Sequence, residues 1–305
     1  MSEERRGTAM GLAAYLIWGS FPLYWPLLKP AGAVEILAHR VVWSLISVAL
    51  LLLVTSGRSA WRSLPRDRRS LGLLGFAGVL IGINWGVYIW GVNHGHVVET
   101  SLGYFVNPLV TVALSVVVLR ERLRPGQWAA VGVAAAGVVV LTVQAGRPPW
   151  IALVLAFSFG AYGLVKKIVG VSPVNGLVVE AAVLVPLAAA YLIVMAARGE
   201  GTFTTHGAGH AALLASSGVV TVVPLLLFAG AAPRIALSRL GLMQYMTPTI
   251  QFLIGVTIRH EPLGAVRLVG FCLVWLALGI FTADLVSLPA RERQVLGERL
   301  LSASE

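Results

Sequence analysis

Long runs of apolar residues constrain this chain more than any other feature of its sequence. A helix needs about 20 such residues to cross the hydrocarbon core of a bilayer, and we find about ten runs of roughly that length. They lie near residues 8–28, 34–54, 71–92, 98–118, 127–145, 149–166, 174–196, 211–231, 238–258 and 263–285. The strands of a membrane barrel are shorter and alternate polar with apolar residues, unlike these runs. The sequence therefore predicts an all-α integral membrane protein with about ten transmembrane helices.

The composition excludes the soluble and the disordered classes of protein. Apolar residues make up 57% of the 305 residues and charged residues only 12%, where a soluble domain has about a quarter. Such a chain has too few charges to face water as a soluble domain, and it is too hydrophobic to stay disordered. The net charge of +10 would suggest a nucleic-acid ligand in a soluble protein, but we expect no nucleic-acid partner here.

The basic residues are distributed unevenly along the predicted topology. With the N-terminus inside, the inner segments hold 17 of the 23 lysines and arginines, the outer segments hold five, and Arg40 falls within a helix. This asymmetry follows the positive-inside rule, and the opposite orientation would invert it. The first run shows no small-residue cleavage site, so we interpret it as a retained helix. We expect a multi-pass protein of the bacterial inner membrane with both termini in the cytoplasm.

The sequence resembles itself at a shift of 140 residues, which places Pro108 over Pro248 and Glu121 over Glu261. Five helices per half is an odd number, so the second half must be inserted upside down relative to the first. Such inverted repeats occur in many secondary transporters, whose substrate site lies near the midplane between the halves. We predict two inverted five-helix repeats and a cytoplasmic tail, at residues 8–145, 149–286 and 287–305.

The motifs of the enzyme classes considered are missing from the sequence. It has no G-x-x-x-x-G-K-[ST] phosphate loop, no G-x-S-x-G elbow and no H-E-x-x-H pair. His206 and His210 have a spacing that suits a metal on a helix, but they lie in a glycine-rich predicted loop. We therefore expect no enzyme, no cofactor and no metal.

Two charged residues lie about six residues into predicted helices, at equivalent positions of the two repeats. They are Arg40 and Glu180, and an unpaired charge at such depth costs at least a few kcal/mol. We expect them to pair or to face a common cavity, with a purely structural ion pair or snorkelling side chains as the alternative. His39 and Glu180 are the candidates for proton coupling, although a hydrogen-bonded helix contact would equally explain His39.

Aromatic, hydroxyl and amide side chains recur at helical spacing along several of the runs. A buried amide must find partners in lipid, so these polar faces are predicted to point inward. Together with Arg40 and Glu180 they are predicted to line a cavity for an organic molecule of modest size. Ordinary packing, with outer aromatics in an interfacial belt, is the alternative. The set consists of Tyr15, Trp18, Asn84, Tyr88, Tyr104, Asn107, Ser158, Tyr162, Tyr245 and Gln251.

Seven stretches, spread over nearly the whole chain, carry a resemblance to a known family. They are AAYLIWGSFPLYW (13–25), EILAHRVVWS (35–44), GINWGVYIWGVN (82–93), ETSLGYFVNPLV (99–110), LAFSFGAYGLVKK (155–167), TVVPLLLFAGAA (221–232) and LSRLGLMQYMTPTIQF (237–252). The chain resembles EamA-type permeases of the drug/metabolite transporter superfamily, and most of all their RarD group. RER at 120–122 departs from the glycine-glutamate-arginine form associated with this loop.

The resemblance implies a secondary transporter with a central cavity between its halves and with its fifth and tenth helices at the periphery. The leading interpretation is an exporter or permease that moves small organic metabolites or drugs by alternating access, with proton coupling left open. A non-transporting membrane scaffold or sensor that binds a partner is the alternative. The expected partners are a small-molecule solute and the lipid bilayer, with a homodimer left open.

Overall fold

A computed structural model describes residues 3–55, 67–120, 123–170, 173–235 and 243–286 of the chain. Within these ranges the regular structure is entirely helical. The predicted all-α membrane class is therefore confirmed, and each predicted apolar run coincides with helical structure. The cytoplasmic tail predicted at 287–305, Glu121, and the first residues of the run at 238–258 lie outside the described residues.

The first half of the chain contains four long helices after a broken first one. Its elements are α1 (Glu3–Gly19), α2 (Phe21–Tyr24), the 3-10 helix η1 (Trp25–Leu28), α3 (Ala33–Thr55), α5 (Arg68–Asn93), α6 (Val97–Leu119) and α7 (Pro125–Ala145). The single helix expected at 8–28 is divided because Pro22 and Pro26 lie in the first turns of α2 and η1. A proline is tolerated in a first turn, where its missing N–H would have no helical partner.

Within the described residues the second half of the chain also contains four long helices, together with short ones. Its elements are α8 (Trp150–Val169), α9 (Pro173–Ala197), α10 (Thr202–Thr205), α11 (Gly207–Ala231), α13 (Met246–Leu253), η2 (Ile254–Ile258) and α14 (Ala265–Val286). The turn η2 is a π-helix that continues α13. Pro108, Pro186 and Pro224 lie inside α6, α9 and α11 without ending them, as neighbouring helices allow in a membrane bundle.

Seven helices of the described residues are long and apolar enough to cross a membrane, and α8 and α13 with η2 contain shorter apolar helices. Helix α1, with 17 residues and two acidic residues in its first turn, is not among the seven. A multi-pass helical membrane protein is thus established. The count of ten crossings stays a prediction.

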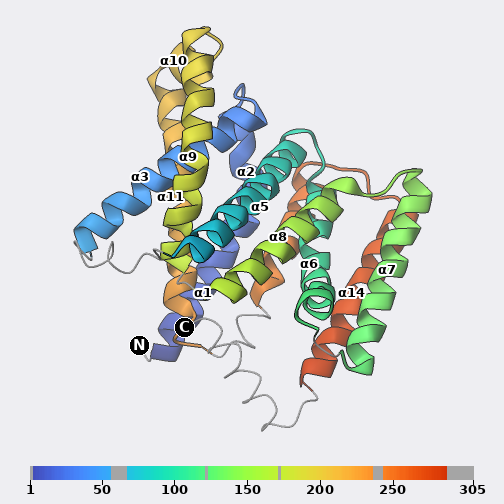
Figure 1. Ribbon diagram of the computed structural model, residues 1–305. Coiled ribbons are helices and arrows are strands. Elements are labelled where there is room, and N and C mark those ends of the chain that lie inside the picture. Colours follow the sequence, from blue (N-terminus) through green and yellow to red (C-terminus); the bar gives the residue numbers. More distant parts are fainter. Residues whose placement is uncertain (1–2, 56–66, 121–122, 171–172, 236–242, 287–305) are drawn as a thin grey trace.

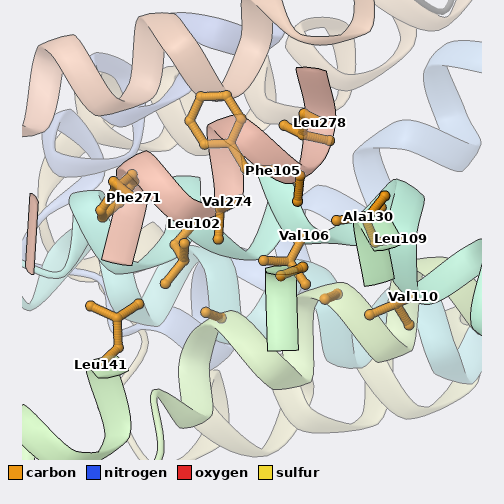
Figure 2. Packing of buried hydrophobic residues seen from close by; sticks show 14 of the residues in the cluster. Leu102, Phe105, Val106, Leu109, Val110, Ala130, Leu141, Phe271, Val274 and Leu278 are labelled. Carbon is orange, nitrogen blue, oxygen red and sulfur yellow. The ribbon is translucent and has the colours of Figure 1, made fainter. Parts of the chain in front are cut away.

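The helices contact one another in a regular pattern (Figure 1). Helix α3 packs on α9 and α11, α5 on α8 and α9, α6 on α8 and α13, and α1 on α11 and α13. Helices α7 and α14 lie side by side at one edge of the molecule (Figure 1). An apolar cluster that includes Leu102, Phe105, Leu141 and Phe271 joins this pair to α6 (Figure 2).

Glycines set the distance between several of these helices. A Cβ atom on Gly78 of α5 would lie 3.1 Å from the backbone oxygen of Glu180 on α9. A Cβ atom on Gly218 of α11 would lie 2.3 Å from the backbone carbonyl of Trp43 on α3. Small residues of this kind allow close backbone approach between membrane helices. They hold α3 and α9, which carry Arg40 and Glu180, against their neighbours.

Candidate functional site

Arg40 is buried among aromatic side chains. Its guanidinium carbon lies 3.8 Å from the ring centroid of Trp85 on α5, and 4.9 Å from that of Trp25 on η1. Phe21 is the third ring, at 5.7 Å, and Nε donates a hydrogen bond of 2.9 Å to Oγ1 of Thr221 on α11. A cation over aromatic faces is stabilised by the ring quadrupoles, most strongly when water is excluded. The arrangement therefore holds a charged guanidinium inside the bundle.

Glu180 has a partner of its own in the neighbouring helix. Its Oε1 accepts a hydrogen bond of 2.7 Å from the ammonium of Lys166, and its Oε2 accepts one of 3.2 Å from the Tyr162 hydroxyl. Glu180 is almost completely buried, and Lys166 is largely so. The site is thus an ion pair supported by a neutral donor.

The predicted direct pairing of Arg40 with Glu180 is wrong, and the direction of the helices explains why. The Glu35 carboxylate, at the start of α3, accepts the backbone N–H of Thr202, which follows the end of α9. Helices α3 and α9 are therefore antiparallel. Arg40 and Glu180 lie equally far from the first residue of their own helix, so they lie toward opposite ends of the contact between the two helices. Arg40 and Glu180 lie on different levels of the bundle.

Trp85 connects the surroundings of the two charges. One of its faces is covered by the Arg40 guanidinium. It also lines a small cavity together with Ser44 and Glu180, whose other walls are mostly aliphatic. The expectation of a common cavity is met only to this extent: Glu180 borders the cavity, and Arg40, which contacts Trp85, is not among the residues that line it.

Asn84 links three helices by hydrogen bonds. Its Nδ2 donates to the Leu155 carbonyl and to Ser158 Oγ, each at 3.0 Å, and its Oδ1 accepts from the Tyr104 hydroxyl at 3.1 Å. The rings of Tyr104 and Tyr88 contact each other, with centroids 5.6 Å apart. The structure thus brings together Asn84, Tyr88, Tyr104 and Ser158, as the polar faces predicted. Their role in substrate binding stays a prediction.

A second group of predicted residues lies between α1 and α13. Tyr15 and Trp18 contact each other, with ring centroids 5.5 Å apart. Gln251 donates from Nε2 to the Trp18 carbonyl at 3.2 Å. Tyr245 packs instead against the apolar cluster of Figure 2. Asn107 is buried, and its backbone carbonyl accepts a hydrogen bond from the Thr111 hydroxyl. These contacts are those of ordinary helix packing, which was the alternative to a substrate cavity.

His39 stacks on Phe203, with ring centroids 4.8 Å apart. Within the described ranges neither of its ring nitrogens has a hydrogen-bond partner, so the hydrogen-bonded contact considered for it is not formed. His206 and His210 lie near each other, with ring centroids 5.6 Å apart. The described residues contain no group of three side chains that could hold a metal ion.

Five residues outside the predicted set contact the buried charges. Phe21, Trp25, Trp85 and Thr221 surround Arg40, and Lys166 binds Glu180. Lys166 follows Tyr162 by four residues, so helical spacing places both on one face, and this signal was available. No signal within one helix could identify Thr221, because its partner lies on α3.

Charged residues inside a bundle of apolar helices mark solute or ion pathways in membrane proteins. Fold and site therefore define a polytopic membrane protein of the transporter class. The chain belongs to the EamA-like transporter family, whose model matches residues 5–143, and within it to the RarD-type permeases of the drug/metabolite transporter superfamily.

Relatives along nearly the full length support this assignment. Protein RarD of Streptomyces exfoliatus is 53% identical over 293 residues, which cover 96% of this chain and 93% of that protein. Uncharacterized transporter YojE of Bacillus subtilis is 42% identical, with 92% and 95% covered. Chloramphenicol-sensitive protein RarD of Pseudomonas aeruginosa is 30% identical, with 91% and 94% covered.

The fold also matches a known crystal structure. The TM-score is 0.55 at 17% sequence identity, and the match covers 91% of this chain and 96% of that one. At this identity the likeness concerns the fold alone. The arrangement of helices is thus shared with a protein of distant sequence.

Proposed function

We propose that this protein is a secondary transporter that exports small organic metabolites or drugs across the bacterial inner membrane by alternating access. The observation that carries the proposal is the burial of Arg40 and Glu180 within the bundle. A charge at such depth costs several kcal/mol, so it is retained where it serves a solute or an ion. Membership of the EamA-like transporter family supports the same conclusion. We expect no enzymatic activity.

The proposal includes two inverted five-helix repeats, at residues 8–145 and 149–286. Exchange of the halves would map α1 onto α8, α3 onto α9, α5 onto α11, α6 onto α13 and α7 onto α14. Under this exchange the contact of α1 with α11 corresponds to that of α8 with α5, and α3 with α11 corresponds to α9 with α5. The pairs α3–α9, α6–α13 and α7–α14 map onto themselves. The pattern of contacts is what a pseudo-twofold axis would generate.

Single close contacts support the repeat in the same way. Gly19 of α1 faces Ile250 of α13, and Gly160 of α8 faces Val110 of α6. Ile250 and Val110 differ by the shift of 140 residues that relates the halves. The proposed topology places both termini in the cytoplasm, following the distribution of basic residues. It can be tested by labelling single cysteines in a Cys272→Ala background from either side of the membrane.

We further assign proton coupling to Glu180, with His39 as the second candidate. Glu180 borders the small cavity beside Trp85, and its charge is balanced by Lys166. Protonation of the carboxylate would break that balance and change the charge of the cavity wall. Glu180→Gln should therefore make solute flux insensitive to a pH gradient, whereas His39→Gln should leave the sensitivity in place.

Flux into and out of proteoliposomes, with and without a pH gradient, tests the transport proposal. The solutes should come from an untargeted comparison of the metabolites released by cells with and without the protein. Transport is supported by saturable flux that requires the protein. Absence of flux for every compound of that comparison would favour the alternative of a scaffold or sensor. In that case the first interaction to test would be the formation of a homodimer.

A further inference from the structure

Several buried hydrogen-bond donors around Arg40 have no partner among the described residues. They are Nη1 of Arg40, Nε1 of Trp25, the hydroxyl of Tyr88 and the hydroxyl of Ser44. A buried polar group without a partner is costly, and more so where the group is charged. A folded chain rarely tolerates several such groups in one place unless a ligand, an ion or ordered water satisfies them. Their chemistry indicates an acceptor.

These donors lie close to the guanidinium. The ring of Trp25 is 4.9 Å from it, and Tyr88 is near enough to interact with it electrostatically. Ser44 follows Arg40 by four residues, which places it on the same face of α3. The donors therefore come from η1, α3 and α5, and they converge on one region.

The charge of this region is that of a single cation. Within the described ranges Arg40 forms no ion pair, since Glu180 is bound by Lys166. The other titratable side chains that interact with Arg40 are the tyrosines Tyr24, Tyr88 and Tyr104, which are neutral at physiological pH. One positive charge among neutral donors matches one negative charge, so a carboxylate suits it better than a doubly charged phosphate.

The space beside the donors is mostly apolar, and the one charged group in its wall is the Glu180 carboxylate, which is paired with Lys166. Ser44 and Trp85 also line the small cavity, and Val41, Ile81, Leu177 and Leu184 contribute its aliphatic walls. A solute with its charged end at Arg40 would place its body against Trp85 and these side chains. A mostly apolar lining with a few polar groups is typical of small-molecule sites.

We propose that Arg40, with Tyr88, Ser44 and Trp25, binds the carboxylate of a monoanionic organic solute whose apolar body packs beside Trp85. This inference rests on the proposed transport function and narrows its substrate to one chemical class. The guanidinium accounts for the charge preference, and the neutral donors add hydrogen bonds to the same group. Neutral drugs and metabolites are then weaker ligands than carboxylates of equal size.

Binding measurements on the purified protein in detergent test the proposed class of substrate, and they do not require transport. The probes are benzoate, phenylacetate and indole-3-acetate, each compared with its amide by calorimetry and by the rise in melting temperature at constant chloride. At least one carboxylate should bind about tenfold more tightly than its amide, because a hydrogen bond to a charged group is worth more than a neutral one. Equal binding of acid and amide, or no binding of any carboxylate, would overturn the proposal.

Variants distinguish a specific loss of the anion site from a general loss of folding. Arg40→Gln should abolish the preference for acid over amide, and Arg267→Gln, at a half-buried arginine that bonds the Pro262 carbonyl away from this site, should keep it. If Arg40→Gln does not fold, Tyr88→Phe serves instead, because its hydroxyl has no partner to lose within the described residues. It should weaken the carboxylate several-fold and leave the amide unchanged; unchanged carboxylate affinity would contradict the assignment.

The outcomes also separate this inference from the proposed function. If carboxylates bind through Arg40 but no solute crosses proteoliposomes, the transport proposal fails and the anion site stands. If solutes are transported but neutral and anionic compounds compete equally, the anion site fails and the transport proposal stands. If chloride alone raises the melting temperature as much as benzoate does, the site belongs to a halide and the organic-acid assignment is wrong.

Discussion

The Lys166 ammonium lies 2.7 Å from Oε1 of Glu180, and the two side chains come from consecutive helices, α8 and α9. Glu180 is only 2% exposed and Lys166 16%. The attraction between two buried charges roughly offsets the cost of removing them from water. Breaking such a pair is costly, however, because it leaves one buried charge without compensation. The relationship therefore constrains the two helices strongly while contributing little net stability.

Lys166→Met should lower the free energy of unfolding by about 3 kcal/mol, because Glu180 is left buried and unpaired. The double variant Lys166→Met with Glu180→Leu should recover most of this loss. Denaturant titration in detergent, followed by tryptophan fluorescence, measures both. The exposed pair of Glu3 with Arg234 is the control, and Glu3→Gln should change stability by less than about 1 kcal/mol. Equal losses in the single and double variants would contradict the coupling.

The sequence was sufficient for the class of fold, because a run of about 20 apolar residues has few structural outcomes other than a membrane helix. It did not predict the ion pair of Lys166 with Glu180. The position of a residue along the chain does not reveal the reach of its side chain. A lysine has a flexible four-carbon stem, which here carries the ammonium back to Glu180.

The candidate site was predictable only within single helices. Helical spacing placed Asn84 and Tyr88 on one face, and both are buried. The partners of Asn84 lie on α6 and α8, and no spacing within α5 identifies them. Arg40 and Glu180 occupy equivalent positions in the two repeats, but this equivalence does not reveal how far along the bundle each side chain lies. Their positions along the bundle depend on the antiparallel contact of α3 with α9.

Glu261 should make stability depend on pH. Its carboxylate accepts the backbone N–H groups of Val97, at 2.5 Å, and Val98, at 2.8 Å, at the start of α6. Burial raises the pKa of this carboxyl above its ordinary value of 4.5, against the opposing effects of these bonds, His96 and Arg267. The folded state then holds more protons than the unfolded one above pH 4.5, so stability should fall as pH rises through that window.

Glu261→Gln removes the titration and one of the two acceptors. It should flatten this part of the pH profile and cost about 1 kcal/mol at neutral pH. Melting temperatures measured between pH 4 and 8 for both proteins test the expectation. A profile of the variant as steep as that of the parent would assign the titration to another group. Glu99→Gln is the matched control, because Glu99 also accepts a helix N-terminal N–H, from Ile151.

Asn84 should be more sensitive to substitution than its small size suggests. Asn84→Ala leaves the Tyr104 hydroxyl, the Leu155 carbonyl and Ser158 without this partner. The expected loss is about 1–3 kcal/mol, the cost of buried groups left unpaired. Tyr104→Phe removes only one of these bonds and should cost less. Thermal unfolding in detergent measures both, and the opposite order would show that packing outweighs hydrogen bonding at this position.

Gly218→Ala should weaken the contact that holds Arg40 in place. The added methyl group would lie 2.3 Å from the backbone carbonyl carbon and oxygen of Trp43, so α3 and α11 must separate. Overpacking of this kind typically costs about 1–3 kcal/mol. Trp43 follows Arg40 by three residues and Gly218 precedes Thr221 by three. The separation should therefore also lengthen the bond from Arg40 to Thr221, and solute flux should fall more than stability alone explains.

Gly132→Ala is the matched control, because nothing lies within 4 Å of a Cβ at that position of α7. There alanine should be neutral or stabilise by about 0.5–1 kcal/mol, since it removes the conformational freedom of glycine from a helix. Melting temperature and flux of the two variants, measured side by side at equal expression, distinguish the effects. If Gly218→Ala and Gly132→Ala behave alike, the close approach of α3 and α11 does not determine the geometry of Arg40.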